Sequence, residues 1–145
     1  MIEDRFTNRV IGLAIDVHRT YGPGLLESAY EDCLCIELAE AGIPFARQVP
    51  ISTIHKGHII ANTYRADIVV GDDLILEIKA VDKIVPLHEA QMLTYLRLSG
   101  RRIGLLFNFN TLRLKEVRGA KPVAPYCDPV MVGRDPTTPD RKSVV

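Results

Sequence analysis

Two carboxylates and two cations occur at positions that neighbouring strands would bring together. A turn centred on Asp72 places Asp67 opposite Glu77. The same turn places Arg65 opposite Lys79. Two carboxylates about 5 Å apart repel by roughly 3 kcal/mol at an effective dielectric near 20. A bound divalent cation reverses that sign, because Mg²⁺ is commonly held by one or two carboxylates together with water. One interpretation of the pattern is therefore a divalent-metal site.

A second interpretation needs no metal. Side chains alternate along strands, so the residues between these four point to the opposite face of the hairpin. That face is wholly apolar and is made by Ala66, Ile68, Val70, Leu74, Leu76, Ile78 and Ala80. The polar face could then simply be solvated, with Arg65 and Lys79 neutralising the two acids. The hairpin alone does not separate the two interpretations.

Hydrophobic periodicity and turn residues predict the elements that would position these groups. In chain order they are a helix from Phe6 to Tyr21, a helix from about Leu25 to Gly42, strands at Gln48–His55, His58–Val70 and Leu74–Ala80, a helix from Pro86 to Ser99, and strands at Ile103–Phe109 and Leu112–Val117. This order predicts an α/β domain over residues 1–121, with a mixed sheet flanked by helices. Residues 122–145 are rich in proline and lack periodicity, which predicts an extended or disordered tail.

Three short motifs surround the carboxylate pair. Glu77-Ile78-Lys79 has the form E-x-K, in which alternation places the acid and the lysine on one side of a strand. Gln91 and Tyr95 are one turn apart on the predicted helix after it. Upstream, residues 24–30 spell G-x-x-E-x-x-Y, with Glu27 at the central position. With these motifs the chain resembles the PD-(D/E)XK nuclease superfamily, specifically its RecB-type branch with a Q-x-x-x-Y helix. From about residue 2 to 121 it also resembles the bacterial GxxExxY protein family.

The resemblance implies a restriction-endonuclease-like core of order αβββαβ and a role for each motif residue. Asp67 and Glu77 would bind Mg²⁺ or Mn²⁺, with the backbone carbonyl of Ile78 as a third ligand. Lys79 would orient the attacking water. Further catalytic residues would be Glu27, an additional acid presented from the second helix, and Gln91 and Tyr95, which would contact phosphate or organise the site. Without the resemblance, Glu27 is one of several exposed glutamates and Tyr95 is a core aromatic residue.

Other side chains give weaker signals. Seven basic residues against one acid lie between Arg97 and Lys121, so Arg97, Arg101 and Arg102 are candidates for nucleic-acid backbone contacts or a solvated face. His88 lies one turn before Gln91 and could face the site. His55 and His58 flank a turn at a spacing that can chelate metal, although exposed polar residues are commoner at a hairpin tip. Asp72 and Asp73 are typical turn residues.

Composition limits the classes of protein. The chain has 145 residues, zero net charge and three cysteines without C-x-x-C spacing, so neither a disulfide framework nor a zinc site is predicted. Its apolar runs are shorter than the roughly 20 residues that a membrane span needs, and no membrane partner is predicted. The first residues lack the features of a signal peptide, which predicts a cytoplasmic location.

Two functional hypotheses follow. The first is a Mg²⁺- or Mn²⁺-dependent nuclease that hydrolyses phosphodiester bonds in DNA or RNA. The second is a binding or assembly module that keeps the fold without turnover, which zero net charge and the lack of a separate DNA-binding motif favour. Nucleic acid is the expected partner under the first hypothesis. The preference for strand type and the choice between a monomer and a homo-oligomer stay open.

Overall fold

A computed structural model describes residues 5–111 and the backbone of residues 120–121. Its elements are α1 (Arg5–Tyr21), α2 (Glu27–Glu40), β1 (Phe45–His55), β2 (His58–Val70), β3 (Leu74–Lys79), α3 (Pro86–Ser99), β4 (Ile103–Asn108) and β5 (Ala120–Lys121). The predicted sequence of helices and strands is confirmed up to β4. The predicted strand Leu112–Val117 and the predicted tail lie outside the described residues.

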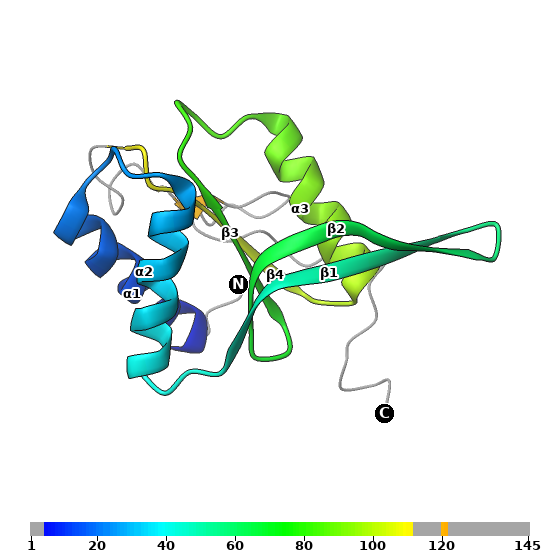
Figure 1. Ribbon diagram of the computed structural model, residues 1–145, viewed down its shortest axis with the longest axis horizontal. Coiled ribbons are helices and arrows are strands. Elements are labelled where there is room, and N and C mark those ends of the chain that lie inside the picture. The colour runs from blue at the N-terminus through cyan, green and yellow to red at the C-terminus, as the bar shows by residue number, and fades with distance from the viewer. Residues whose placement is uncertain (1–4, 112–119, 122–145) are drawn as a thin grey trace.

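The strands form one mixed sheet in the order β1-β2-β3-β4-β5 (Figure 1). The pairs β1–β2, β2–β3 and β4–β5 are antiparallel, whereas β3 and β4 are parallel. Parallel neighbours need a crossover connection, and α3 supplies it between β3 and β4. All six residues of β4 are buried, and five of them, Ile103 to Phe107, form an apolar run that is typical of a strand covered on both faces. The predicted α/β fold with a mixed sheet flanked by helices is confirmed.

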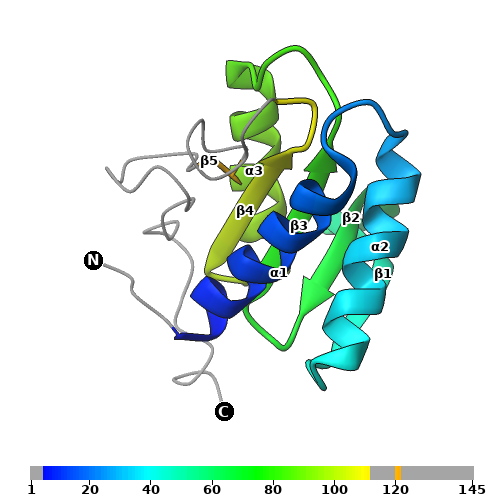
Figure 2. The same cartoon turned by 90° about the vertical axis from the view of Figure 1, so that its left-hand side faces the viewer.

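Helices cover both faces of the sheet. Figure 2 shows α1 and α2 in front of the strands and α3 behind them. The cluster under α1 and α2 includes Val10, Ala14, Tyr30, Leu34, Ile68, Leu76, Ile78 and Phe107. The cluster under α3 includes Ile51, Ala66, Val69, Ile75, Met92, Leu96 and Leu106. Each face of the sheet therefore has its own apolar core.

This arrangement corrects two expectations about the hairpin β2–β3. Its polar face is not solvated, because Val69 and Ile75 on that side pack under α3 and Glu77 is only 5% exposed. Ala66 was assigned to the opposite, wholly apolar face, yet it belongs to the cluster under α3. Tyr21 and Leu26, whose spacing fits the apolar stripes of the first two helices, are exposed, because Tyr21 is the last residue of α1 and Leu26 precedes α2.

A close approach between α3 and the sheet requires a glycine in β4. A Cβ atom added at Gly104 would collide with the side chain of Met92, which is fully buried on α3. Gly104 therefore lets the helix pack directly on the strand that neighbours β3. This contact sets the position of α3, which carries Gln91 and Tyr95, relative to β3, which carries Glu77 and Lys79.

Candidate active site

The register of β2 and β3 places Asp67 beside Glu77, as the turn predicted. The backbone ladder pairs Val70 with Leu74 and ends at the pair Ile68–Leu76. Beyond this pair, side-chain carboxylates in place of backbone carbonyls accept the hydrogen bonds from backbone N–H groups. Glu77 Oε2 accepts the N–H of Asp67 at 3.1 Å, and Asp67 Oδ2 accepts the N–H of Ile78 at 2.8 Å. The other oxygen of each carboxylate takes no part in these two hydrogen bonds.

Burial makes this pair electrostatically unfavourable. Desolvation, followed by the neighbouring Asp67 carboxylate, raises the pKa of Glu77 from 4.5 to about 9, and the Lys79 ammonium opposes the shift only weakly. Without a cation the pair therefore holds a proton at neutral pH. Within residues 5–111, no three His, Cys, Asp or Glu side chains are grouped to hold a metal ion. The donors that fit a divalent cation here are two carboxylates, backbone and water, a set that suits Mg²⁺.

The carbonyl of Ile78 points to the side of β3 that carries Asp67. In a strand, the N–H and C=O groups of one residue point to the same side, so that paired residues exchange both bonds. Because the N–H of Ile78 points to Asp67 on β2, its carbonyl also points towards β2. The β2–β3 ladder has already ended at this level. The carbonyl of Ile78, the expected third ligand, therefore lies on the same side of β3 as Asp67.

The G-x-x-E-x-x-Y segment brings Glu27 to the carboxyl end of β3. Tyr30 is fully buried and stacks on Phe109, with ring centroids 4.5 Å apart. Its hydroxyl donates to the carbonyl of Gly22 at 2.5 Å and accepts the N–H of Leu25 at 3.1 Å, which holds the loop before α2 in place. From the first turn of α2, Glu27 Oε1 accepts the N–H of Ala80 at 2.9 Å. The carboxylate of Glu27 therefore lies beside the backbone of Ala80, the residue that follows Lys79.

The face of α3 that carries Gln91 runs along the same site. His88 accepts the N–H of Val85 through Nδ1 at 3.1 Å, and its pKa is lowered by burial and then by the nearby Lys79 ammonium, with Glu27 opposing. Tyr95 lies within electrostatic reach of both carboxylates. Burial and then Glu77 and Asp67 raise the pKa of Tyr95 to about 12. Gln91 lies between His88 and Tyr95 on α3, one helical turn from each.

The described structure thus joins α2, β2, β3 and α3 around one carboxylate pair, in the order that the motifs predicted. The family model of the PD-(D/E)XK nuclease superfamily matches residues 4–119. The chain belongs to the PD-(D/E)XK nuclease superfamily. No curated protein and no solved structure shows a match to the chain. Nucleases of this superfamily generally use divalent metal ions.

One residue that supports the PD-(D/E)XK site escaped the sequence interpretation. Asn108 is buried at the end of β4, where it pairs in register with Lys79. Its side chain accepts the N–H of Val81 at 3.1 Å and donates to the carbonyl of Val81 at 2.9 Å. These two bonds hold the chain as it leaves β3. A polar residue inside the apolar run Ile103–Phe109 was the available signal.

The structure does not bring the three candidate arginines to this PD-(D/E)XK site. Arg102 donates to Asp73 at 2.7 Å, at the amino end of β3 and β4, whereas Glu77 and Lys79 lie towards the carboxyl end of β3. Arg101 precedes it, and Arg97 occupies the last turn of α3, away from His88. No helix in the described ranges is long and apolar enough to cross a membrane.

Proposed function

We propose that this chain is a Mg²⁺- or Mn²⁺-dependent nuclease that hydrolyses phosphodiester bonds in DNA or RNA. The observation that carries the proposal is a buried glutamate, Glu77, whose closest charged neighbour is a second carboxylate at the open end of a strand pair. A protein that needed only a stable sheet could place an apolar residue at either position. Two acids kept together favour a cation that comes from outside the chain.

Asp67, Glu77 and the carbonyl of Ile78 would hold the metal ion. When bound, the ion would polarise the scissile phosphate and lower the pKa of a bound water. Lys79 is half-buried beside Glu77, so its ammonium can donate to a water and to a phosphate oxygen. Glu27 orients the backbone after Lys79 by accepting from Ala80. Gln91 and Tyr95 supply polar groups from α3 for contact with the phosphate.

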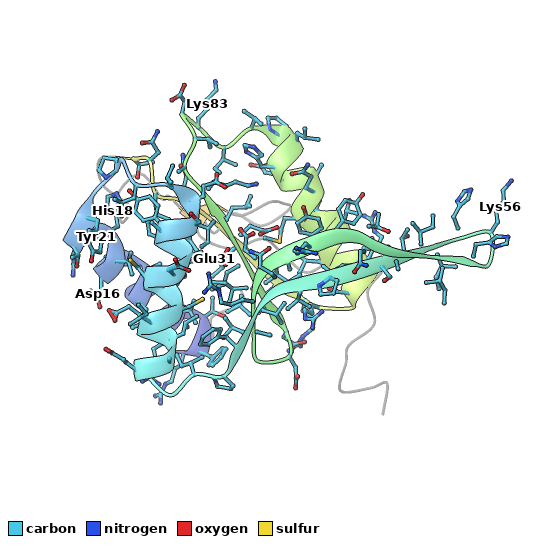
Figure 3. The ribbon with its side chains drawn as sticks, in the orientation of Figure 1. Asp16, His18, Tyr21, Glu31, Lys56 and Lys83 are labelled. Atoms are coloured by element: carbon cyan, nitrogen blue, oxygen red, sulfur yellow. The ribbon has the colours of Figure 1, made fainter. Side chains whose placement is uncertain are left out.

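The first test measures metal binding by calorimetry, with three matched carboxylate variants. Binding of Mn²⁺ should be lost in Asp67→Asn and Glu77→Gln, because each removes a charged ligand. It should persist in Asp16→Asn, whose acid lies exposed on α1 far from β3 (Figure 3). If the two site variants bind Mn²⁺ as the parent does, the proposed ligands are wrong.

The second test measures cleavage of labelled single-stranded and double-stranded DNA and RNA. Cleavage should require Mg²⁺ or Mn²⁺ and should be absent in the two variants that lose metal. A parent that binds metal yet leaves all four substrates intact with either ion would favour the alternative function, a catalytically silent binding or assembly module. In that case Arg97, Arg101 and Arg102 would belong to a surface separate from the carboxylate pair.

A further inference from the structure

The far half of the hairpin β1–β2 forms an arm, defined here as residues 52–63. It extends beyond the helices and the rest of the sheet (Figure 1). Eleven of its residues are exposed and Thr53 is half-buried. The register shifts between Ile51 and Thr53, and Asn62 has a positive φ of 55° on the partner strand. Such irregularities bend and twist a strand pair, so the arm is set at an angle of its own.

The arm exposes aliphatic side chains that a free hairpin would not need. Ile54 and Ile59 are cross-strand partners, exposed by 69% and 75%, and therefore lie side by side on one face. Ile60 is 46% exposed on the same arm. Isoleucines that project from both strands of a narrow ribbon form an apolar wedge, and no part of the described chain covers it.

The charge of the arm selects its partner. Residues 52–63 contain no Asp or Glu and one lysine, Lys56, and Arg65 follows further along β2. Lys56 lies at the tip of the hairpin (Figure 3). An acid-free ribbon in a protein of zero net charge is complementary to a phosphate backbone.

The turn at the tip gives independent support. Lys56 and Gly57 have φ values of 50° and 80°. A two-residue turn with both φ values positive favours Asn, Asp or Gly at its first position, because their side chains tolerate the left-handed region. Lysine is a poor choice for that backbone. Lys56 therefore places a positive charge at the outermost point of the arm at some cost in turn stability.

We infer that the arm enters the minor groove of duplex DNA when a phosphodiester bond lies at Asp67 and Glu77. This inference rests on the proposed nuclease function and names its substrate class. Aliphatic wedges inserted between base steps from the minor groove are an established mode of binding and bending duplexes. In the bound complex Ile54 and Ile59 contact base steps, and Lys56 contacts a phosphate.

Geometry and composition both favour a duplex. β2 runs from the tip to Asp67, and its rise of about 3.3 Å per residue sets an upper limit of roughly 30 Å on the distance from the tip to the carboxylates. That span is close to one helical turn of B-DNA, about 34 Å. Sites for single strands use aromatic side chains as stacking platforms, and the arm contains no Phe, Tyr or Trp.

The apolar wedge is tested by fluorescence anisotropy in EDTA, so that no cleavage interferes. The full chain is titrated into a labelled duplex of about 20 base pairs, roughly two helical turns, and into one of its single strands. The double variant Ile54→Thr/Ile59→Thr keeps β-branched residues in the strands. It should weaken duplex binding about tenfold or more, because apolar contact is lost. The control Ile36→Thr, at an isoleucine on α2 that is 58% exposed, should not change binding.

The tip is tested with Lys56→Asn. Asparagine suits the positive φ, so the melting temperature should stay the same or rise. Loss of one phosphate contact should reduce the slope of log affinity against log salt concentration by about one. Weaker binding by a protein that is no less stable cannot be attributed to misfolding. The control is Arg19→Gln, which removes an exposed cation from α1.

Three outcomes would overturn the inference. The arm variants could bind the duplex as the parent does, or they could lose single-strand and duplex binding equally. The parent could also prove to be a dimer that dissociates in Ile54→Thr/Ile59→Thr, which would identify the arm as a self-association surface. Cleavage with Mn²⁺ is measured separately. If duplex binding depends on the arm but no cleavage occurs, the role of the arm is supported and the proposed nuclease function is wrong. If cleavage occurs and the arm variants bind the duplex as the parent does, the nuclease function is supported and the role of the arm is wrong.

Discussion

Two glutamates are buried in the described part of the molecule, and their carboxylates have opposite surroundings. Glu31 on α2 is 7% exposed and Glu77 on β3 is 5% exposed. Glu31 lies on the side of its helix that faces β1 (Figure 3). It accepts from Arg47 Nη2 at 2.8 Å and from Gln48 Nε2 at 2.9 Å. Glu77 accepts the backbone N–H of Asp67 and lies against the Asp67 carboxylate.

The difference separates a structural carboxylate from one available for chemistry. At Glu31 the chain supplies the compensating charge, because the guanidinium of Arg47 is shared with Asp32 as well. The same bonds raise the pKa of Arg47, so this cation stays charged. At Glu77 the compensating charge must be a proton or a cation from solution. A buried acid whose nearest charged neighbour is another acid is therefore the better guide to a functional site.

The largest expected effect concerns Lys79, whose ammonium lowers the pKa of Glu77. Lys79→Met keeps much of the stem and removes the charge. If the metal ion is the true partner of Glu77, metal binding should persist. The rate of cleavage should fall about 10²–10³-fold, which is the loss of one preorganised contact to a transition state, roughly 3–4 kcal/mol.

Single-turnover kinetics with saturating Mn²⁺ measures this effect, with Lys83→Met as the control. Lys83 is exposed in the loop after β3 and should leave the rate unchanged. Loss of metal binding in Lys79→Met, with the fold intact, would mean that the lysine organises the carboxylates and does not act on the substrate.

The next effect compares the two glutamates directly, by urea denaturation of the metal-free protein. Glu31→Gln leaves the guanidinium of Arg47 without its buried partner and should lower the free energy of unfolding by about 1–3 kcal/mol. Glu77→Gln replaces a carboxyl group that is already protonated at neutral pH with a neutral amide, and it should leave that free energy unchanged or raise it. Asp32→Asn, the exposed partner of the same Arg47, should cost less than about 1 kcal/mol. Equal losses for the two glutamates would show that Glu77 is also a structural residue.

Much of the site could be predicted from sequence because it depends on local geometry. The turn at Asp72 and the alternation of a strand are enough to place Asp67 beside Glu77, and the ladder from Ile68 to Val70 has that register. A helix has a period of its own, so Gln91 and Tyr95 share a face whatever the rest of the fold does. These relations need no knowledge of distant contacts.

The remaining features depend on tertiary packing. The expectation of a solvated hairpin face failed because α3 covers Val69 and Ile75, two apolar residues on the face that carries Asp67 and Glu77, and the helix that covers them is distant in sequence. The pair Glu31–Arg47 joins a helix to a strand across a loop, so neither residue signals the other. His88 was considered only for its spacing, although its pKa responds to both Lys79 and Glu27 in the folded chain.

The last effect is the pH dependence of stability that follows from Glu77. Its pKa is about 9 in the folded metal-free protein and 4.5 ordinarily, so the folded state binds the extra proton between these values. Stability from this group is complete below pH 4.5 and is lost as the pH rises towards 9. The slope should be at most about 1.4 kcal/mol per pH unit. Glu77→Gln has no such proton and should have a flatter profile in EDTA, whereas parallel profiles would exclude the raised pKa.

The proton that Glu77 holds in the metal-free protein allows a second comparison of Glu77 with Glu31. Binding of Mn²⁺ at pH 7 requires ionised ligands, so Glu77 must release the proton that it holds in the metal-free state. Calorimetry in buffers of different ionisation enthalpy should therefore detect close to one proton released for each ion bound. Glu31→Gln should release the same number, since Glu31 already has its cation in Arg47. Release of no proton at pH 7 would show that Asp67 and Glu77 are both ionised before metal arrives, and that the chain itself compensates them.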